Sequence, residues 1–345
     1  MPRTLERDAL PALARGFALL GSGGGGSPWI LDLALRESPV WPVVLHDVAD
    51  LDPATPCMAL AYAGATMLLD ERLPDEAPFA PAITALERWL GHRVPAICSL
   101  EAGGMNGLAC LPLARERQWV DADLMGRALP DFDQLSLAVD GVPGLVAVGP
   151  TGAGGVAVID GARADDVEAV LRAAITCAGG SAAVVVGGFT VGDLIEHGLI
   201  GTHARAQSLG ERYLAEPDAG IASRADAIGA RVLGAGRITE VLPDPLDLRV
   251  TAIEVRTAEG DTVRLVARSE LLACMRNGVV EAASPTIVLA VDERTHEVLQ
   301  VQELTAGRHI AVLSLPGPDW WCGTPERHAR VSPSHYGLTA LEERR

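Results

Sequence analysis

Three short segments of the 345-residue sequence combine residue types and spacings that could do chemistry, and the first is glycine-rich. It runs Gly21-Ser-Gly-Gly-Gly-Gly-Ser-Pro28. Consecutive glycines let backbone N–H groups turn toward a common point, and a helix expected from Pro28 adds its positive N-terminal end. The run therefore favours a close approach of the backbone to a ligand, such as a carboxylate or another anion, or to another segment, with Gly23, Gly24 and Gly25 as donors. The alternative is a flexible connection between two helices.

The second segment, Glu101-Ala-Gly-Gly-Met-Asn106, directly follows an apolar run at 94–100 that predicts a buried strand. In open parallel sheets, ligands bind beyond the carboxyl ends of the strands. Glu101 offers a base, the Gly-Gly turn offers backbone donors, and the Asn106 amide offers an orienting group. A strand-to-helix turn with Asn106 as its N-cap is an alternative that is compatible with this interpretation.

The third segment, Asp121-Ala-Asp123-Leu-Met-Gly-Arg127, lies just past a short apolar run at 119–121. Alternate carboxylates at a strand end can point into one cleft, where they bind a hard metal or act as acid and base. Arg127 could bind a carboxylate of the substrate or one of these two aspartates. The alternative is an Asp–Arg turn on the surface.

The composition excludes several mechanisms. All 28 basic side chains are arginines, because the sequence contains no lysine. A Schiff base, a P-loop and a Ser-Lys hydrolase are therefore excluded. The formal charge of −17 argues against a nucleic-acid partner, since phosphate binding needs a positive surface. We expect a small-molecule substrate instead.

The six cysteines form no CxxC pair, and most lie in apolar runs typical of buried thiols. The eight histidines form neither HExxH nor HxH, so a zinc site could be assembled only from distant segments. No apolar stretch approaches the roughly 18 residues that span a bilayer. The first eight residues lack the apolar core of a signal peptide. These features predict a cytoplasmic protein without a membrane partner. They do not decide whether the protein forms a homo-oligomer.

The residues between these segments predict an α/β N-terminal domain at 1–162 with a mixed or parallel sheet. Apolar runs at 58–63 and 94–100 are typical of buried strands, and the amphipathic segment 79–90 between them predicts a helix. A strand, a helix and a strand in this order indicate a parallel pair. The pattern predicts a further helix near 108–117.

The remainder, 163–345, predicts a C-terminal α+β domain that is helical at 163–233, with one strand at 182–186, and β-rich at 234–320. A hairpin is expected at 248–268 around the turn 258–261, and a second at 286–301 around the turn 292–295. Short strands at this spacing are typical of a small barrel or sandwich.

Taken together, the three segments resemble the S-methyl thiohydantoin desulfurase family. The run Leu19–Pro28, the segment Glu101–Asn106 and the segment Val120–Arg127 resemble its GGGG-x-P, E-x-GG-x-N and VDAD-x-MGRA motifs, in chain order. A weaker GT-x-S pattern fits at 199–210. There the pattern expects Ser after Gly-Thr, whereas this chain has His203-Ala204.

The resemblance implies an α/β domain followed by a β-rich domain. It also implies a hydrolase that acts on a five-membered thiohydantoin- or hydantoin-like ring and displaces a thiol with activated water. Zinc is the implied cofactor, and the motifs do not indicate its ligands. On this basis Glu101 or Asp123 is the base or a metal ligand, Asp121 is its partner, and Arg127 and Asn106 orient the substrate. The alternative is a non-catalytic ligand-binding or accessory subunit of a hydantoinase/oxoprolinase-type system, with a hydantoinase-type partner.

Overall fold

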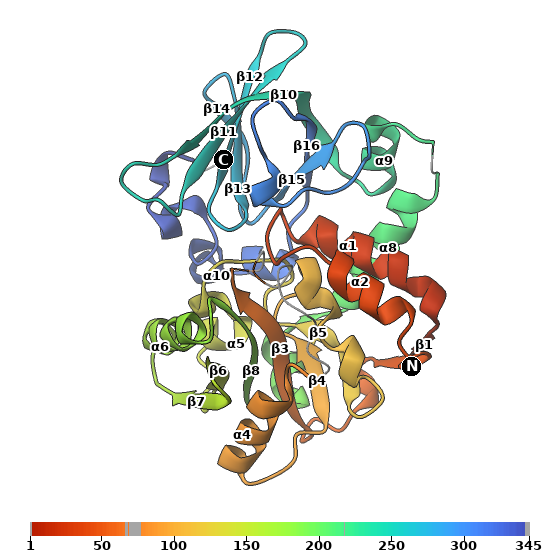
Figure 1. Ribbon diagram of the computed structural model, residues 1–345, viewed down its shortest axis with the longest axis vertical. Coiled ribbons are helices and arrows are strands. Elements are labelled where there is room, and N and C mark those ends of the chain that lie inside the picture. The colour runs from red at the N-terminus through yellow and green to blue at the C-terminus, as the bar shows by residue number, and fades with distance from the viewer. Residues whose placement is uncertain (1, 66–67, 69–76, 217, 342–345) are drawn as a thin grey trace.

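The computed structural model describes residues 2–65, 68, 77–216 and 218–341. In this part of the chain two sheets lie along the long axis of the molecule, with the second above the first in the view of Figure 1. The first sheet contains β1 (Arg3–Leu5), β2 (Val43–His46), β3 (Pro56–Gly64), β4 (Ala96–Ser99), β5 (Gln118–Asp123), β6 (Val146–Gly152), β7 (Gly155–Asp160), β8 (Ser181–Thr190) and β9 (Leu199–Ile200).

The first sheet is mixed, and its order is β1-β2-β5-β4-β3-β8-β6-β7, with β9 paired to β5. The neighbours β2, β5, β4 and β3 are parallel to one another, whereas β8 pairs antiparallel with both β3 and β6. The predicted parallel pair is β3 and β4, and α4 (Ala80–Leu90) connects them. The predicted α/β class with a mixed sheet is therefore confirmed.

The second sheet is antiparallel throughout and curls into a half-barrel, which confirms the predicted β-rich end of the chain. Its order is β14-β13-β12-β11-β10-β16-β15. The strands are β10 (Arg231–Pro243), β11 (Thr251–Thr257), β12 (Thr262–Ala267), β13 (Leu271–Arg276), β14 (Val279–Ala283), β15 (Ile287–Asp292) and β16 (His309–Leu315).

Helices cover the first sheet and link it to the second (Figure 1). The largest apolar cluster contains Phe17 of α1 together with Leu289 of β15 and Leu313 of β16, so the two sheets share part of one core. The helices are α1 (Leu10–Leu20), α2 (Trp29–Arg36), α4, α5 (Ser136–Val139), α6 (Ala164–Cys177), α7 (Val191–His197), α8 (Thr202–Leu214), α9 (Ile221–Ala227) and α10 (Pro325–Ala329). None of these helices, in the described residues, is long and apolar enough to cross a membrane.

Two local predictions are wrong. The segment 108–117 forms no α-helix. It begins at the last residue of one 3-10 turn, Gly104–Leu108, and contains a second one, Leu111–Leu113. Pro112 offers no N–H for a helix, and Gly107 lies so close to Phe17 that a Cβ there would be 2.2 Å from the ring.

The hairpin expected at 286–301 is also wrong, whereas the one at 248–268 is confirmed by the β11–β12 pair. The strand β15 pairs with β16, and the segment after its turn forms no second strand. It meets β15 at the bridge Val291–Val298, where Leu299 donates its N–H to the carbonyl oxygen of Ala290 and Asp292 donates to that of Glu297, both at 2.9 Å. The reason lies in the glycine-rich run, because Val301 donates its N–H to the carbonyl oxygen of Gly23 at 2.8 Å.

Candidate active site

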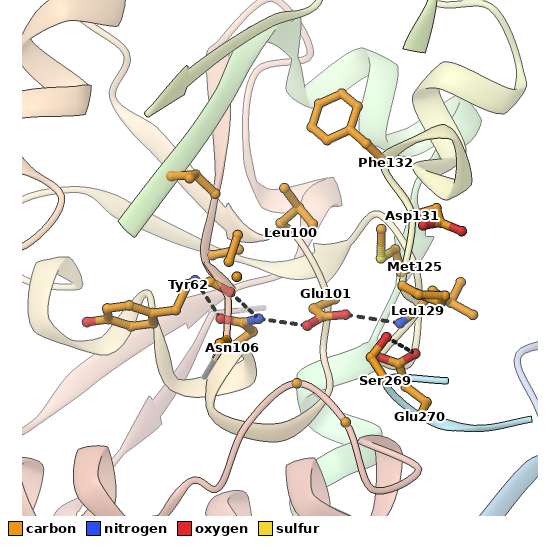
Figure 2. A pocket seen from close by; sticks show the side chains of 18 of the residues that line it. Tyr62, Leu100, Glu101, Asn106, Met125, Leu129, Asp131, Phe132, Ser269 and Glu270 are labelled. Carbon is orange, nitrogen blue, oxygen red and sulfur yellow. Dashed lines mark hydrogen bonds between the residues drawn. The ribbon is translucent and has the colours of Figure 1, made fainter. Parts of the chain in front are cut away.

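A pocket of about 390 Å³ lies where the glycine-rich run meets β3, the loop after β4 and the turn between β12 and β13. This volume is in the range of small-molecule sites. Figure 2 shows Asn106 and Glu101 on one side, and Ser269 and Glu270 beyond Glu101. Both halves of the chain therefore contribute side chains to the pocket.

Glu101 lies just beyond the carboxyl end of β4, as the sequence predicts, and is only 7% exposed. Its Oε1 accepts a hydrogen bond from Asn106 Nδ2 at 2.6 Å, and its Oε2 accepts one from the N–H of Leu129 at 3.1 Å. Burial, together with the nearby carboxyl of Glu270, raises the pKa of Glu101 to about 8. Glu101 therefore keeps its proton at neutral pH.

Glu270 is the second acid of the pocket, and it is 3% exposed. The hydroxyl of Ser269 donates to its Oε2 at 2.9 Å. Burial raises the pKa of Glu270 to about 7, although Ser269, Arg127 and Arg268 all favour the charged form. The sequence analysis missed this residue because it belongs to no motif. The only signal was its position in a turn of the predicted β-rich region.

The glycine-rich run lets the two acids approach each other. A Cβ on Gly24 would lie 2.4 Å from Cγ of Glu270, and a Cβ on Gly25 would lie 3.2 Å from Oε1 of Glu101. Gly25 also has a φ of +70°, a conformation that favours glycine. Gly24 and Gly25 thus line the pocket, whereas Gly23 lies outside its lining.

Much of the run's hydrogen-bonding capacity is used within the protein. The N–H of Gly24 donates to the carbonyl oxygen of Gly21 at 2.7 Å. The hydroxyl of Ser22 lies 3.0 Å from the carbonyl oxygen of Leu271 and 2.7 Å from that of Val288. In this arrangement the run fastens α1 to the second sheet, and the amide of Gly24 is not available to an anion.

Asn106 holds Glu101 in place. Its Oδ1 accepts from the N–H of Tyr62 at 2.7 Å, and its Nδ2 donates to the carbonyl oxygen of Tyr62 at 3.0 Å. The same Nδ2 donates to Glu101, so the carboxyl is tied to β3. The turn at this point begins after Gly103, so the interpretation of Asn106 as an N-cap is wrong.

Asp123 and Arg127 lie behind the pocket rather than in its lining, and neither side chain has exposed surface. Oδ2 of Asp123 accepts from the N–H groups of Ala102 at 2.7 Å and Gly126 at 2.6 Å. This carboxyl fixes the backbone immediately after Glu101, and burial raises its pKa to about 6. The alternative of an Asp–Arg turn on the surface is therefore wrong.

The guanidinium of Arg127 joins the two halves of the chain. It donates to the carbonyl oxygens of Pro285 at 3.2 Å and Thr286 at 3.0 Å. Burial lowers the pKa of Arg127, while the carboxyls of Glu270 and Glu101 favour its charge. Arg127 thus places a positive charge behind the two acids.

Asp121 lies away from the pocket, against the beginning of α8. Its Oδ1 accepts from the N–H of His203 at 2.8 Å and lies 3.5 Å from Nδ1 of the same residue. Nε2 of His203 lies 3.0 Å from Oγ of Ser99. This order of Ser, His and Asp matches a hydrolase triad. However, Ser99 and His203 have no exposed surface and neither lines the pocket, so the triad is closed to a substrate.

Among the described residues, the group that could hold a metal ion is Asp131, Asp133 and His335. Their ligand atoms lie within 4.8 Å of one another, and Asp131 also lines the pocket. Two carboxylates and an imidazole suit a metal site that keeps a position for water. Oδ1 of Asp133 is buried without a hydrogen-bond partner in the described structure, which also fits a ligand. The same carboxylates pair with arginines, Asp131 with Arg268 at 2.5 Å and Asp133 with Arg330 at 3.0 Å.

Because three buried acids have raised pKa values, we expect the free energy of unfolding to fall as the pH rises. Glu101, Glu270 and Asp123 have pKa values raised to about 8, 7 and 6, above those of the unfolded chain. The folded state therefore binds more protons between about pH 4.5 and 8, and its stability falls across this window. Denaturant unfolding should show a fall on the order of 3 kcal/mol from Glu101 alone.

The matched variants for this measurement are Glu101→Gln and Glu216→Gln. The first should flatten the upper part of the pH dependence, because it removes the acid with the highest of the three pKa values. The second replaces an exposed carboxyl and should leave the profile as it is. A free energy of unfolding that rises from pH 5 to pH 8 would contradict the expectation.

The fold and the site define an α/β protein whose second, antiparallel sheet helps to enclose a small-molecule pocket with two buried glutamates. The S-Me-THD-like N-terminal domain model matches residues 8–161, and the S-Me-THD-like C-terminal domain model matches residues 162–344. The chain therefore belongs to the S-Me-THD-like family, the S-methyl thiohydantoin desulfurase family that its motifs resemble. No curated protein matches the chain.

A solved structure of similar fold is the crystal structure of a protein from Chromobacterium violaceum, a target of the Northeast Structural Genomics Consortium. The two chains are 20% identical, the match covers 99% of each, and the TM-score is 0.81. At this identity the similarity establishes the fold alone.

Proposed function

We propose that the pocket is the active site of a hydrolase that displaces a thiol from a five-membered thiohydantoin- or hydantoin-like ring by activated water. The observation that carries this proposal is the pair of buried acids, Glu101 and Glu270, in one pocket of small-molecule size. Their surroundings separate their pKa values, about 8 against about 7. In a pair of carboxyls such as this, one can act as acid and the other as base. Membership of the S-Me-THD-like family supports the choice of ring.

In the proposed reaction, water attacks the ring carbon that bears the sulfur, and a C–O bond forms. Glu270 takes a proton from the attacking water, and Glu101 gives its proton to the ring nitrogen that becomes negative. The tetrahedral intermediate then collapses to a carbonyl, the C–S bond breaks, and the thiolate takes the remaining proton. The products are the ring carbonyl with an N–H and one thiol, and Glu101 regains a proton from Glu270.

The other residues singled out in the motifs act on this pair indirectly. Asn106 and Asp123 hold Glu101 and the backbone next to it, and Arg127 favours the charged form of Glu270. We assign Asp123 and Arg127 positioning roles, because neither lines the pocket. Asp121 holds the start of α8 through two backbone N–H groups.

We further propose that Asp131, Asp133 and His335 hold zinc at the edge of the pocket. When bound there, zinc would supply a Lewis acid that polarises a substrate group or a water molecule. The chain's own contribution is to bring three ligands together beside the pocket. Asp131 is the ligand that also lines the pocket.

Asp133→Asn tests the zinc proposal, because it removes a ligand charge while keeping the size of the side chain. Wild-type protein reconstituted with zinc should hold about one ion per chain, and the variant should bind zinc at least tenfold more weakly. Asp319→Asn, at an exposed position, is the matched control and should keep wild-type affinity. Elemental analysis and a competing chelator give the measurement, and equal affinity in all three proteins would refute the assignment.

The activity itself is tested with an S-methyl thiohydantoin and a colorimetric assay for the released thiol. The proposal expects catalytic release that increases with enzyme concentration and is lost in Glu270→Gln. Binding of the ring without turnover would instead support the accessory, non-catalytic alternative. If a series of rings shows neither binding nor turnover, the proposed function is excluded.

A further inference from the structure

His203 is a buried residue that the proposed mechanism does not use. It is the second residue of α8 and belongs to the His203-Ala204 pair, where the chain departs from the family's sequence pattern. Its ring meets that of Phe17 from α1 at 5.5 Å and that of Trp119 from β5 at 5.1 Å, both edge to face. The side chain has no exposed surface and does not line the pocket. The imidazole is therefore held by packing, out of reach of a ligand.

His203 joins the ends of two neighbouring strands. Its Nε2 lies 3.0 Å from Oγ of Ser99, the last residue of β4. Its backbone N–H donates to Oδ1 of Asp121 on β5 at 2.8 Å. Nδ1 lies 3.5 Å from the same Oδ1 and has no hydrogen-bond partner among the described residues. One residue of α8 thus ties β4 and β5 together.

Both strands lead from this point to Glu101. Ser99 is two residues before Glu101 and lies opposite Asp123 in the register of β4 and β5. Asp121 is two residues before Asp123, whose Oδ2 accepts the N–H of the residue after Glu101 at 2.7 Å. A displacement at His203 would therefore reach Glu101 by two routes, along β4 and through Asp123.

The same cluster links the charge of His203 to that of Glu101. Burial raises the pKa of Asp123 to about 6, and a positive charge on His203 opposes this rise. Burial and the carboxyl of Glu270 are the main causes of the raised pKa of Glu101, and a charged Asp123 adds to them. A protonated His203 therefore helps Asp123 to stay charged and Glu101 to keep its proton.

The other titratable groups around Asp123 come from β4, the segment after it and α8. Burial raises the pKa of the Cys98 thiol on β4 and that of the Cys110 thiol, so both stay neutral. Arg205 of α8 lies close enough to Asp123 for the two charges to interact. The first turn of α8 thus presents both His203 and Arg205 to the acids of β5.

On the basis of the proposed function, we propose that His203 is a positioning residue for Glu101. It holds the ends of β4 and β5 so that the Glu101 carboxyl lies in the pocket beside Glu270, and it does not touch the substrate. The departure from the family pattern at this point then supports the general acid from behind. The alternative is a histidine that only fills space against Phe17 and Trp119.

Kinetics of His203→Ala and His203→Gln distinguish these roles, with thiol release from an S-methyl thiohydantoin measured between pH 5.5 and 9. The alanine loses the contact with Ser99, so kcat should fall by about tenfold or more while KM changes less than about threefold. The glutamine amide can still reach Ser99 and should restore kcat to within about threefold of wild type.

The glutamine variant should also change the pH profile, because its side chain carries no charge. Without a positive charge at this position, Asp123 keeps its proton to higher pH. The pKa of Glu101 then falls, because Glu101 loses a neighbouring negative charge. The alkaline limb of the profile should therefore move to lower pH by about half a unit.

Two matched variants separate positioning from loss of packing. Phe17→Leu loosens the packing around the imidazole, so it should lower the melting temperature and leave the alkaline limb in place. His92→Gln replaces an exposed histidine and should behave as wild type. If His203→Ala does not fold, Ser99→Ala gives the same test, because it removes only the hydroxyl that Nε2 contacts.

The outcomes separate this inference from the proposed function. If the wild-type protein releases no thiol from any ring, the proposed function fails and this inference fails with it. If the wild type is active but the alkaline limb of His203→Gln coincides with that of wild type, the positioning role is refuted while the function stands. A loss in His203→Ala that appears in KM and not in kcat also refutes it.

Discussion

Glu101→Gln is expected to lower kcat/KM for an S-alkyl thiohydantoin by 10²- to 10⁴-fold, the usual contribution of a general acid. The glutamine keeps the size of the side chain, so the pocket should retain its shape, but it cannot deliver a proton to the ring nitrogen. The wild-type pH profile should be bell-shaped, with limbs set by the acids whose pKa values are about 7 and about 8. The variant's residual activity should lack the fall on the alkaline side.

Glu168→Gln is the matched control for this variant. Glu168 also lines the pocket, but its carboxylate accepts from the N–H of Phe132 at 2.7 Å and binds Arg172. Because the proposed mechanism gives it no proton to transfer, its replacement should cost less than tenfold. Initial rates of thiol release between pH 5.5 and 9 give both profiles. A kcat/KM of Glu101→Gln within tenfold of the wild-type value would show that Glu101 is not the general acid.

Gly210→Ala is expected to destabilise the protein by about 3 kcal/mol or more, an effect typical of severe overpacking. Gly210 lies on α8 where this helix crosses α1, and a Cβ there would be 1.8 Å from the carbonyl oxygen of Ala12. Gly16 makes the reciprocal approach, since its Cβ would be 1.7 Å from the carbonyl oxygen of Ala206. Backbone contacts this close leave no side chain to rearrange, so the helices must separate.

Gly220→Ala is the control for a glycine without such contacts. Nothing lies within 4 Å of a Cβ at Gly220, and its φ of −72° suits alanine. This replacement should leave stability within about 1 kcal/mol of wild type or raise it slightly. Denaturant unfolding measures both variants. A Gly210→Ala protein as stable as Gly220→Ala would show that α1 and α8 are not packed as described.

The sequence predicted the parts of the site that depend on local structure. Glu101 and Asn106 follow a parallel strand, and that position alone places them at a ligand-binding edge. The glycine-rich run was expected to allow a close approach, and it does so at Gly24 and Gly25. Glu270 could not be predicted, because it reaches the pocket only when the second sheet packs against the first, which no local pattern encodes.

The motif at 121–127 shows a second limit. Its spacing indicated acids in a cleft, but the bulge between β4 and β5 and the turn after β5 direct Asp123 to backbone N–H groups and Arg127 to the other half of the chain. The apolar run at 182–186 was correctly predicted as a strand. Its insertion between β3 and β6 depends on pairing over more than one hundred residues, which periodicity cannot specify.

The insertion of β8 between β3 and β6 limits where the chain can be cut into fragments. The family models meet between residues 161 and 162, yet β8 belongs to the later segment and lies inside the earlier sheet. A fragment that stops at the boundary would leave β3 and β6 as bare edges, open to pairing with other molecules. Truncation at this point is therefore expected to yield aggregating material, because the first segment lacks a strand from the middle of its own sheet.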